Sequence, residues 1–198
     1  SNEAEVRRLQ KIADQVLVLV NGKRLHQSSL LHTNSTIGRG SSSVDLNTIP
    51  LLAVERVEVL RDGAAAQYGS DAIAGIINIV LKGYGQTNQA LLGWGRTTQG
   101  DGIQRQASLF HSTALASDGF FNITAELRDR GSSNRARPDA DGQTRLHFGD
   151  ADTQDGQLAW NGELPQGDTT LFSHGHLSRR HSRAGAFFRD ADSDKNLP

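Results

Sequence analysis

VERVEVLRDGAAAQYGSDAIAGIINIVLK, residues 54–82, is the stretch that determines the fold of this chain. Its first part, Val54–Leu60, alternates apolar residues such as Val57 and Val59 with charged ones, as a β-strand does. Its last part, Gly75–Leu81, is apolar or β-branched at nearly every position, which is typical of a strand covered on both faces. Two covered strands joined by a compact glycine-containing turn are therefore expected to form the core of a small mixed domain.

The segments upstream fit the same domain. Residues 3–15 place apolar side chains at helical spacing, which predicts a short amphipathic helix. An apolar run at 16–20 is followed by Asn21-Gly22, a strong signal for a tight hairpin.

These residues also resemble the end of the plug domain of TonB-dependent outer-membrane receptors. That family's signature runs strand, Leu-Arg-x-Gly, small residues, Tyr-Gly-Ser, small residues, Ile-Asn-Ile and Lys, and residues 54–82 follow it. The similarity extends upstream through VLVLVNGKRLH at 16–26 and VDLNTIP at 44–50. Because the segments occur in order and at compatible spacing, the resemblance is specific.

The resemblance implies an energy-coupled receptor of the cell outer membrane that takes up a scarce large solute, such as an iron-siderophore complex. In such receptors a plug fills a β-barrel, and a TonB-type energising protein pulls on the plug to open a path. We expect the segment that binds this energising protein to be absent from the chain. The resemblance implies no enzymatic activity and no cofactor.

After Lys82 the sequence becomes a series of alternating strands, of which 119–130 is the clearest. Its apolar residues share one face and its polar residues share the other. The apolar set is Phe121, Ile123, Ala125 and Leu127, and the polar set is Asn122, Thr124, Glu126 and Arg128. A membrane β-barrel wall has this pattern, with apolar residues toward lipid, and so does a soluble sheet with one wet face.

We therefore expect an α+β plug-like core at 1–82, a mixed short sheet with short helices, followed at 83–198 by antiparallel strands that begin a transmembrane β-barrel. About five strands are expected, whereas the smallest transmembrane barrels have about eight. The chain is thus expected to be an incomplete fragment of a plugged barrel. Because open strand edges tend to pair with other strands, we also expect an edge-to-edge homodimer of the fragment.

The long polar segment at 27–43 is the candidate ligand-binding region, since hydroxyl and amide groups offer many hydrogen bonds to a polar solute. The resemblance implies that this loop faces the extracellular side and touches the solute. The candidates are Ser28, His32, Asn34, Ser35, Arg39 and Ser41. The alternative is a solvated connector.

Charged residues of the central stretch are candidates for fastening the plug. Glu55 and Glu58 lie among Arg56 and Arg61, a pattern that favours ion pairing over acid-base catalysis. The resemblance implies that Arg56, Glu58 and Arg61 lock the plug to the barrel. Ordinary surface pairing is the alternative.

Other chemistry is disfavoured by the sequence. The 21 Lys and Arg nearly balance the 22 Asp and Glu, which does not indicate nucleic-acid binding, and there is no cysteine. Neither a nucleotide-binding loop nor a nucleophile elbow occurs. Two weak metal patterns, the pair His174 and His176 and the aspartates of 150–156 and 190–194, lack the further ligands that a metal site needs, so none is expected.

The alternative to the receptor is a soluble β-rich binding or structural module with no transport role. The two interpretations differ in where Phe121, Ile123 and Leu127 point. In a soluble module they would lie in a closed core, whereas in a receptor they would form an exposed apolar band.

Overall fold

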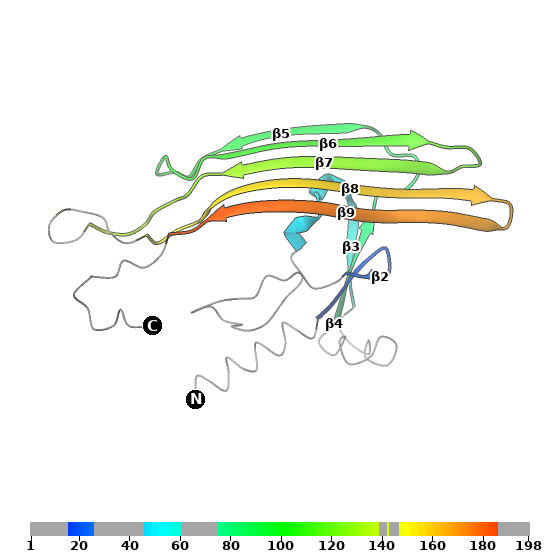
Figure 1. The fold of residues 1–198 in the computed structure, drawn as a ribbon, viewed down its shortest axis with the longest axis horizontal. Coiled ribbons are helices and arrows are strands. Elements are labelled where there is room, and N and C mark those ends of the chain that lie inside the picture. The colour runs from blue at the N-terminus through cyan, green and yellow to red at the C-terminus, as the bar shows by residue number, and fades with distance from the viewer. Residues whose placement is uncertain (1–15, 26–45, 61–74, 139–141, 143–146, 186–198) are drawn as a thin grey trace, which may run out of the picture.

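The computed structural model describes residues 16–25, 46–60, 75–138, 142 and 147–185, which form two β-sheets (Figure 1). A four-stranded small sheet has the order β2-β1-β4-β3, and a five-stranded long sheet has the order β5-β6-β7-β8-β9. The predicted helix at 3–15 lies outside the described residues. In the described part of the chain, no helix has the length and apolar character needed to cross a membrane.

The small sheet is mixed, as expected. β4 (Gly75–Leu81) is central, parallel to β1 (Val16–Val20) and antiparallel to β3 (Val54–Leu60). β1 and β2 (Lys23–Arg24) form the predicted hairpin. Its turn residues have positive φ, 47° at Asn21 and 75° at Gly22, the geometry that Asn-Gly favours.

The expectation that both strands of the central stretch are covered is correct for β4 and wrong for β3. Within the described residues, β3 is the edge strand of its sheet and pairs with β4 alone. Its Val57 and Val59 side chains are 57% and 60% exposed. The alternation of apolar and charged residues predicts a strand. The position of that strand in the sheet depends on pairing with residues far away along the chain.

The long sheet is an antiparallel meander. It comprises β5 (Gln89–Gly95), β6 (Gln104–Ala114), β7 (Phe120–Arg130), β8 (Asp152–Gln166) and β9 (Thr169–Arg183). At one end, short turns join β6 to β7 and β8 to β9. At the other end lie the longer β5–β6 and β7–β8 connections, which we call the loop end.

The long sheet buries its polar face and exposes its apolar face, whereas a sheet of a soluble protein does the opposite. The polar face, which carries Asn122, Thr124 and Glu126, is buried, and Glu126 is only 1% exposed. The apolar face, which carries Phe121, Ile123 and Leu127, is open, and Leu127 is 67% exposed. This outcome is the one expected of a receptor wall rather than of a soluble module.

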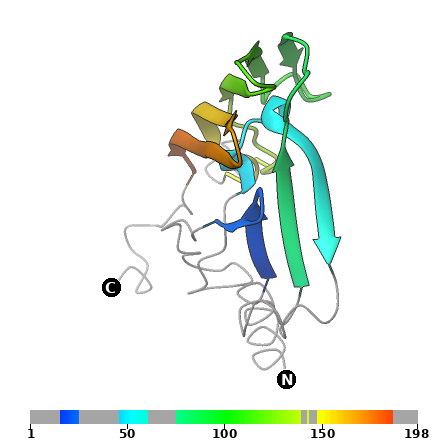
Figure 2. The same ribbon diagram turned by 90° about the vertical axis from the view of Figure 1, so that its right-hand side faces the viewer.

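Side chains between the two sheets form the main apolar core. Two short 3-10 helices, η1 (Leu46–Thr48) and η2 (Leu51–Ala53), precede β3 and lie between the sheets (Figure 2). The buried cluster comprises Val18, Val20, Ile49, Ala53, Ile79 and Leu81, together with Ala159 of β8. Burying side chains of this size contributes about 1.5–3 kcal/mol for each of the larger ones. The small sheet is therefore seated on the polar face of the long sheet.

Candidate functional site

The junction between the two sheets is fixed by two asparagines of the long sheet. Asn122 Nδ2 donates to the carbonyl oxygens of Lys82 at 2.7 Å and Gly83 at 2.8 Å. Asn161, which pairs directly opposite Asn122, donates from Nδ2 to the same Lys82 oxygen at 3.0 Å. The point where the small sheet ends is thus held to β7 and β8 by three hydrogen bonds.

Asn21 extends this junction to the hairpin of the small sheet. Its Nδ2 donates to Asn161 Oδ1 at 3.1 Å, and its Oδ1 accepts from the Leu81 amide at 2.9 Å. The left-handed backbone that the tight turn requires therefore also positions the Asn21 side chain between the two sheets.

Lys82 itself lies in a partly buried position. Its ammonium donates to Gln89 Oε1 at 2.9 Å and lies 4.6 Å from the centre of the Phe110 ring. Burial lowers the pKa of Lys82, and the nearby Glu55 carboxylate partly opposes that shift. The residue that ends the family signature is thus a structural member of the junction.

The η1 segment makes a second polar contact with the long sheet. Gln157 of β8 donates from Nε2 to the Asn47 carbonyl oxygen. Thr48 Oγ1 lies 3.4 Å from His176 Nε2 on β9. The small sheet and its leading segment thus contact β7, β8 and β9.

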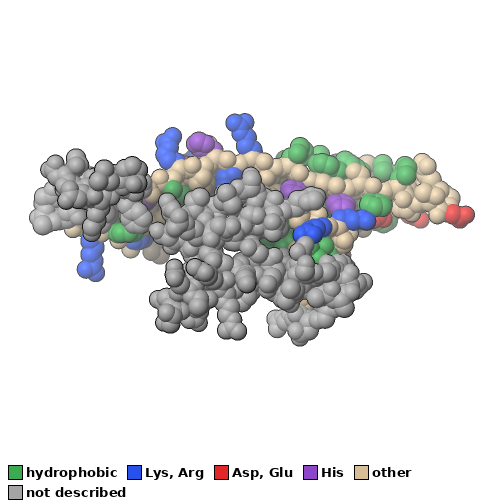
Figure 3. All heavy atoms as spheres, turned by 60° about the horizontal axis from the view of Figure 1, so that its bottom comes forward, with side chains coloured by type: hydrophobic (Ala, Val, Ile, Leu, Met, Phe, Trp, Pro, Cys, Tyr) green, Lys and Arg blue, Asp and Glu red, His purple; other side chains and the backbone are tan. Residues whose placement is uncertain are grey.

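Beyond η1, toward the loop end, the polar face forms a groove of about 520 Å³. Its polar residues follow the strand register. The neutral Gln106 lies opposite Arg128, Arg128 lies opposite Asp155, and Asp155 lies opposite Arg180. In the space-filling view, individual basic side chains project from this half of the sheet, and others lie nearer its middle (Figure 3). The chain thus offers a polar, partly enclosed volume beside the seated small sheet.

Most of the charges in this region are paired. Arg180 Nε donates to Asp155 Oδ1 at 2.5 Å. Glu126 accepts from Ser108 Oγ at 2.8 Å, from Gln106 Nε2 at 2.9 Å and from Arg128. A buried carboxylate with this many donors stays satisfied although it is removed from water.

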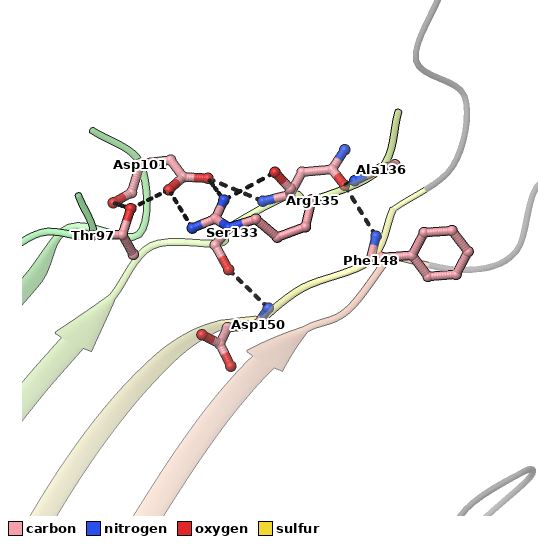
Figure 4. A network of polar contacts seen from close by, with 8 residues as sticks. Thr97, Asp101, Ser133, Arg135, Ala136, Phe148 and Asp150 are labelled. Atoms are coloured by element: carbon pink, nitrogen blue, oxygen red, sulfur yellow. Dashed lines mark hydrogen bonds and ion pairs between the residues drawn. The ribbon is translucent and has the colours of Figure 1, made fainter. Parts of the chain in front are cut away.

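At the loop end, a polar network joins the β5–β6 and β7–β8 connections (Figure 4). Arg135 donates to both carboxylate oxygens of Asp101, at 2.7 and 3.1 Å, and Thr97 Oγ1 donates to the same carboxylate at 2.5 Å. The hydrogen bond from Arg135, followed by those from Thr97 and the Asn134 backbone, holds the pKa of Asp101 far below its usual range. Asp101 in turn raises the pKa of Arg135.

The residues predicted to bind ligand and to lock the plug have different outcomes. The six candidates of the 27–43 segment and Arg61 lie outside the described residues. Arg56 and Glu58 lie on β3, where they bond each other at 2.9 Å, and Glu58 also accepts from Asn78 Nδ2 at 2.8 Å. Asn78, and then Arg56, lower the pKa of Glu58. Among the described residues, the hydrogen bonds and ion pairs of Arg56 and Glu58 lie within the small sheet, so the lock to the barrel stays a prediction.

The residues of the two metal patterns have other roles where the structure describes them. His174 and His176 share the polar face of β9, where His176 meets Thr48. Asp155 belongs to a strand and is paired with Arg180, so the sequence 150–156 does not form a continuous loop. Within the described ranges, no group of three or more His, Cys, Asp or Glu gathers. Residues 190–194 lie outside them.

Sequence reasoning missed the two asparagines and Gln157 as contact residues. Alternation had placed Asn122 on the polar face, but its acceptors are backbone carbonyls, which have no sequence signal. The excess of asparagine and glutamine on a buried face is the one available clue.

Comparison with known proteins gives a consistent result. A family model described as TonB-dependent Receptor Plug Domain matches residues 2–76. The vitamin B12 transporter BtuB of Vibrio cholerae serotype O1 is 31% identical over 137 residues, which are 69% of this chain and 20% of that transporter. The chain thus spans about a fifth of the length of the curated relatives it matches.

Two solved structures share the fold. The ferric enterobactin receptor PfeA of Pseudomonas aeruginosa matches with a TM-score of 0.66 and 21% identity, covering 85% of this chain and 26% of that one. The siderophore receptor PirA of Acinetobacter baumannii matches with the same TM-score and identity, covering 85% of this chain and 24% of that one. The predicted fold class, a mixed plug-like sheet followed by antiparallel wall strands, is confirmed. The relatives are named as a transporter and receptors, in agreement with a protein that is not an enzyme.

Proposed function

Because the chain belongs to the TonB-dependent receptors of the outer membrane, we propose that it acts in the energy-coupled uptake of a scarce large solute, such as an iron-siderophore complex. Receptors of this family interact with TonB and bind siderophores or other solutes. The small sheet corresponds to the plug and the long sheet to the first part of the barrel wall.

The observation that carries the proposal is the seating of the small sheet on a buried polar face, while the apolar face is exposed. A wall of this kind presents apolar side chains to lipid and polar side chains to the lumen. The seated plug obstructs the lumen, and the hydrogen bonds at Lys82 and at η1 hold it there. Solute passage then requires that part of the plug leave its seat.

Transport in cells that lack their own uptake receptors tests this function. The full-length receptor is expressed with and without TonB, and accumulation of radiolabelled iron supplied as several siderophore complexes is compared with that of labelled cyanocobalamin. We expect uptake of an iron complex that depends on TonB. Equal uptake without TonB would refute the energy-coupled function, and uptake of cyanocobalamin alone would refute the iron-siderophore assignment.

A second test asks whether the plug must move. The cysteine-free chain allows Thr48→Cys and His176→Cys to be joined by a cleavable thiol cross-linker, since the two native side chains meet at 3.4 Å. Cross-linking should block uptake while solute binding persists, and cleavage should restore uptake. The single-cysteine variants, treated identically, are the matched controls.

The domain division at residues 82 and 83 and the edge-to-edge dimer of the chain stay predictions. Light scattering of the chain in detergent tests the dimer, because a single-copy particle would exclude it.

A further inference from the structure

The structure assigns the groove at the loop end of the polar face as a binding site for a carboxylate group of the solute, with Arg130 as its principal donor. This inference rests on the proposed uptake function and narrows its substrate to a class. Three features of the polar face support it: the charge of Arg130, the volume of the groove, and the row of hydrogen-bond donors beside Arg130.

Arg130 is the cation of this groove that has no acidic partner among the described residues. Arg128 is paired with Glu126, and Arg180 is paired with Asp155. The Nε of Arg130, in contrast, is buried and has no hydrogen-bond partner in the described part of the chain. Arg130 also lines the groove, so the other N–H groups of its guanidinium are the ones that can donate to an anionic ligand there.

The register places neutral donors on both sides of Arg130. Arg130 on β7 has two direct cross-strand partners, Gln104 on β6 and Thr153 on β8. All three residues line the groove. An amide, a guanidinium and a hydroxyl in one row provide hydrogen bonds to two oxygens of one group.

Two glycines create the space in front of this row. Gly93 and Gly95 of β5 lie opposite Gln106 and Gln104, so the polar face has no side chains at these positions. A Cβ built at Gly95 meets nothing within 4 Å. The resulting groove of about 520 Å³ lies within the range of about 300–1,000 Å³ typical of small-molecule sites.

The charge balance selects a carboxylate over a dianionic group. With Arg128 and Arg180 neutralised, one positive charge remains to be matched, and a carboxylate supplies one negative charge. Its two coplanar oxygens also match the fork of a guanidinium. A phosphate dianion would bring a second negative charge close to Glu126 and Asp155.

Binding to the purified full-length receptor tests the assignment. The probes are ferric citrate, an uncharged ferric trihydroxamate and cyanocobalamin, each measured by isothermal titration calorimetry. We expect ferric citrate to bind at least tenfold more tightly than either neutral probe. Arg130→Gln should weaken ferric citrate binding at least tenfold, and Arg130→Lys should weaken it less.

Two further variants separate binding from folding. Gly95→Leu keeps every charge, fits without a backbone clash and fills the groove, so it should also weaken ferric citrate binding at least tenfold. Arg179→Gln removes an arginine of β9 whose side chain lies on the opposite face of the sheet, so binding should be unchanged. Migration as a heat-modifiable band before and after boiling confirms that each variant is folded.

Each outcome decides the question. Ferric citrate binding that survives both Arg130→Gln and Gly95→Leu, or tighter binding of a neutral probe, would overturn the carboxylate site. TonB-dependent uptake of a neutral solute would then leave the proposed function standing. Groove-dependent ferric citrate binding without TonB-dependent uptake would instead refute the proposed function and leave the carboxylate site standing.

Discussion

Asn122 donates its side-chain amide to the carbonyl oxygen of Lys82 at 2.7 Å, and this bond joins the middle of a wall strand to the last residue of the plug signature. Asn161 donates to the same oxygen from the next strand. These bonds hold the last strand of the plug sheet to the wall.

Replacing both asparagines by alanine should loosen this junction. The Lys82 and Gly83 carbonyls lose their side-chain donors, at a cost of about 1–3 kcal/mol for each buried group left unpaired. Hydrogen exchange of the amides around residues 81–83 should therefore become faster in the double variant. Asn88→Ala, which removes a side-chain acceptor for the Ser112 amide within the wall, is the control and should leave that region unchanged. Unaltered exchange in the double variant would contradict the proposed anchor.

Glu126→Ala should destabilise the wall, because it leaves the Arg128 guanidinium and the Ser108 hydroxyl without their buried acceptor. Breaking a buried pair in this way costs about 3–5 kcal/mol. Glu126→Gln keeps one acceptor oxygen and should cost less. The free energy of unfolding, measured by urea titration of the receptor in detergent, should rank the two variants in this order. Glu163→Ala, at an exposed position of β8, serves as the control.

Arginine on the apolar face should disturb membrane insertion in a depth-dependent manner. Ile123→Arg lies in the middle of the apolar band and should cost about 2–4 kcal/mol. Asp129→Arg lies on the same face of β7, where Arg105 and Asp129 already form a charged pair, and should cost about 0–1 kcal/mol. Folding yields into lipid vesicles compare the two. Equal yields would argue against a lipid-facing surface.

Gly175→Ala should displace the Trp160 indole. A Cβ at Gly175 would overlap carbon atoms of the Trp160 ring, which covers this glycine from the neighbouring strand. Such overpacking costs about 1–3 kcal/mol. The chain has 2 tryptophans, so Trp94→Phe makes the fluorescence report on Trp160 alone. Its emission should shift in the Gly175→Ala variant and not in Gly167→Ala at the distant turn.

The Asp101 network should stay intact well below neutral pH. Arg135 and Thr97 hold the pKa of Asp101 below its usual value of about 3.9. Its contribution to stability is therefore fully present above about pH 3.9 and is lost as the pH falls further toward the lower pKa of the folded state. An NMR titration of the Asp101 carboxyl carbon measures this shift, and an ordinary value would contradict the ion pair. Asp101→Asn should speed exchange of the Asn134 amide at pH 7.

Alternation along the chain was enough to predict the strands and the residues that share a face. The strand expected at 119–130 is Phe120–Arg130 in the structure. Asp155 of β8 and Arg180 of β9 lie on the polar face, where the two side chains pair with each other.

The sequence did not show which face of each sheet is covered. Leu127 and Glu126 alternate as they would in a soluble sheet, and only the seated plug reverses the usual burial. The position of β3 at a sheet edge and the contacts of Asn122 depend on residues far away along the chain. The register of Arg130 between Gln104 and Thr153 likewise needed the three-dimensional pairing.

The parallel pairing of β1 with β4 has a mechanical consequence. Tension applied ahead of Val16 drags β1 toward its own beginning, while the bonds at Lys82 restrain β4 at its far end. The two parallel strands are then loaded in shear, so that all five paired positions from Val16↔Gly75 to Val20↔Ile79 resist together rather than unzipping one by one. A strand held in this way resists small forces and separates abruptly once the force exceeds a threshold.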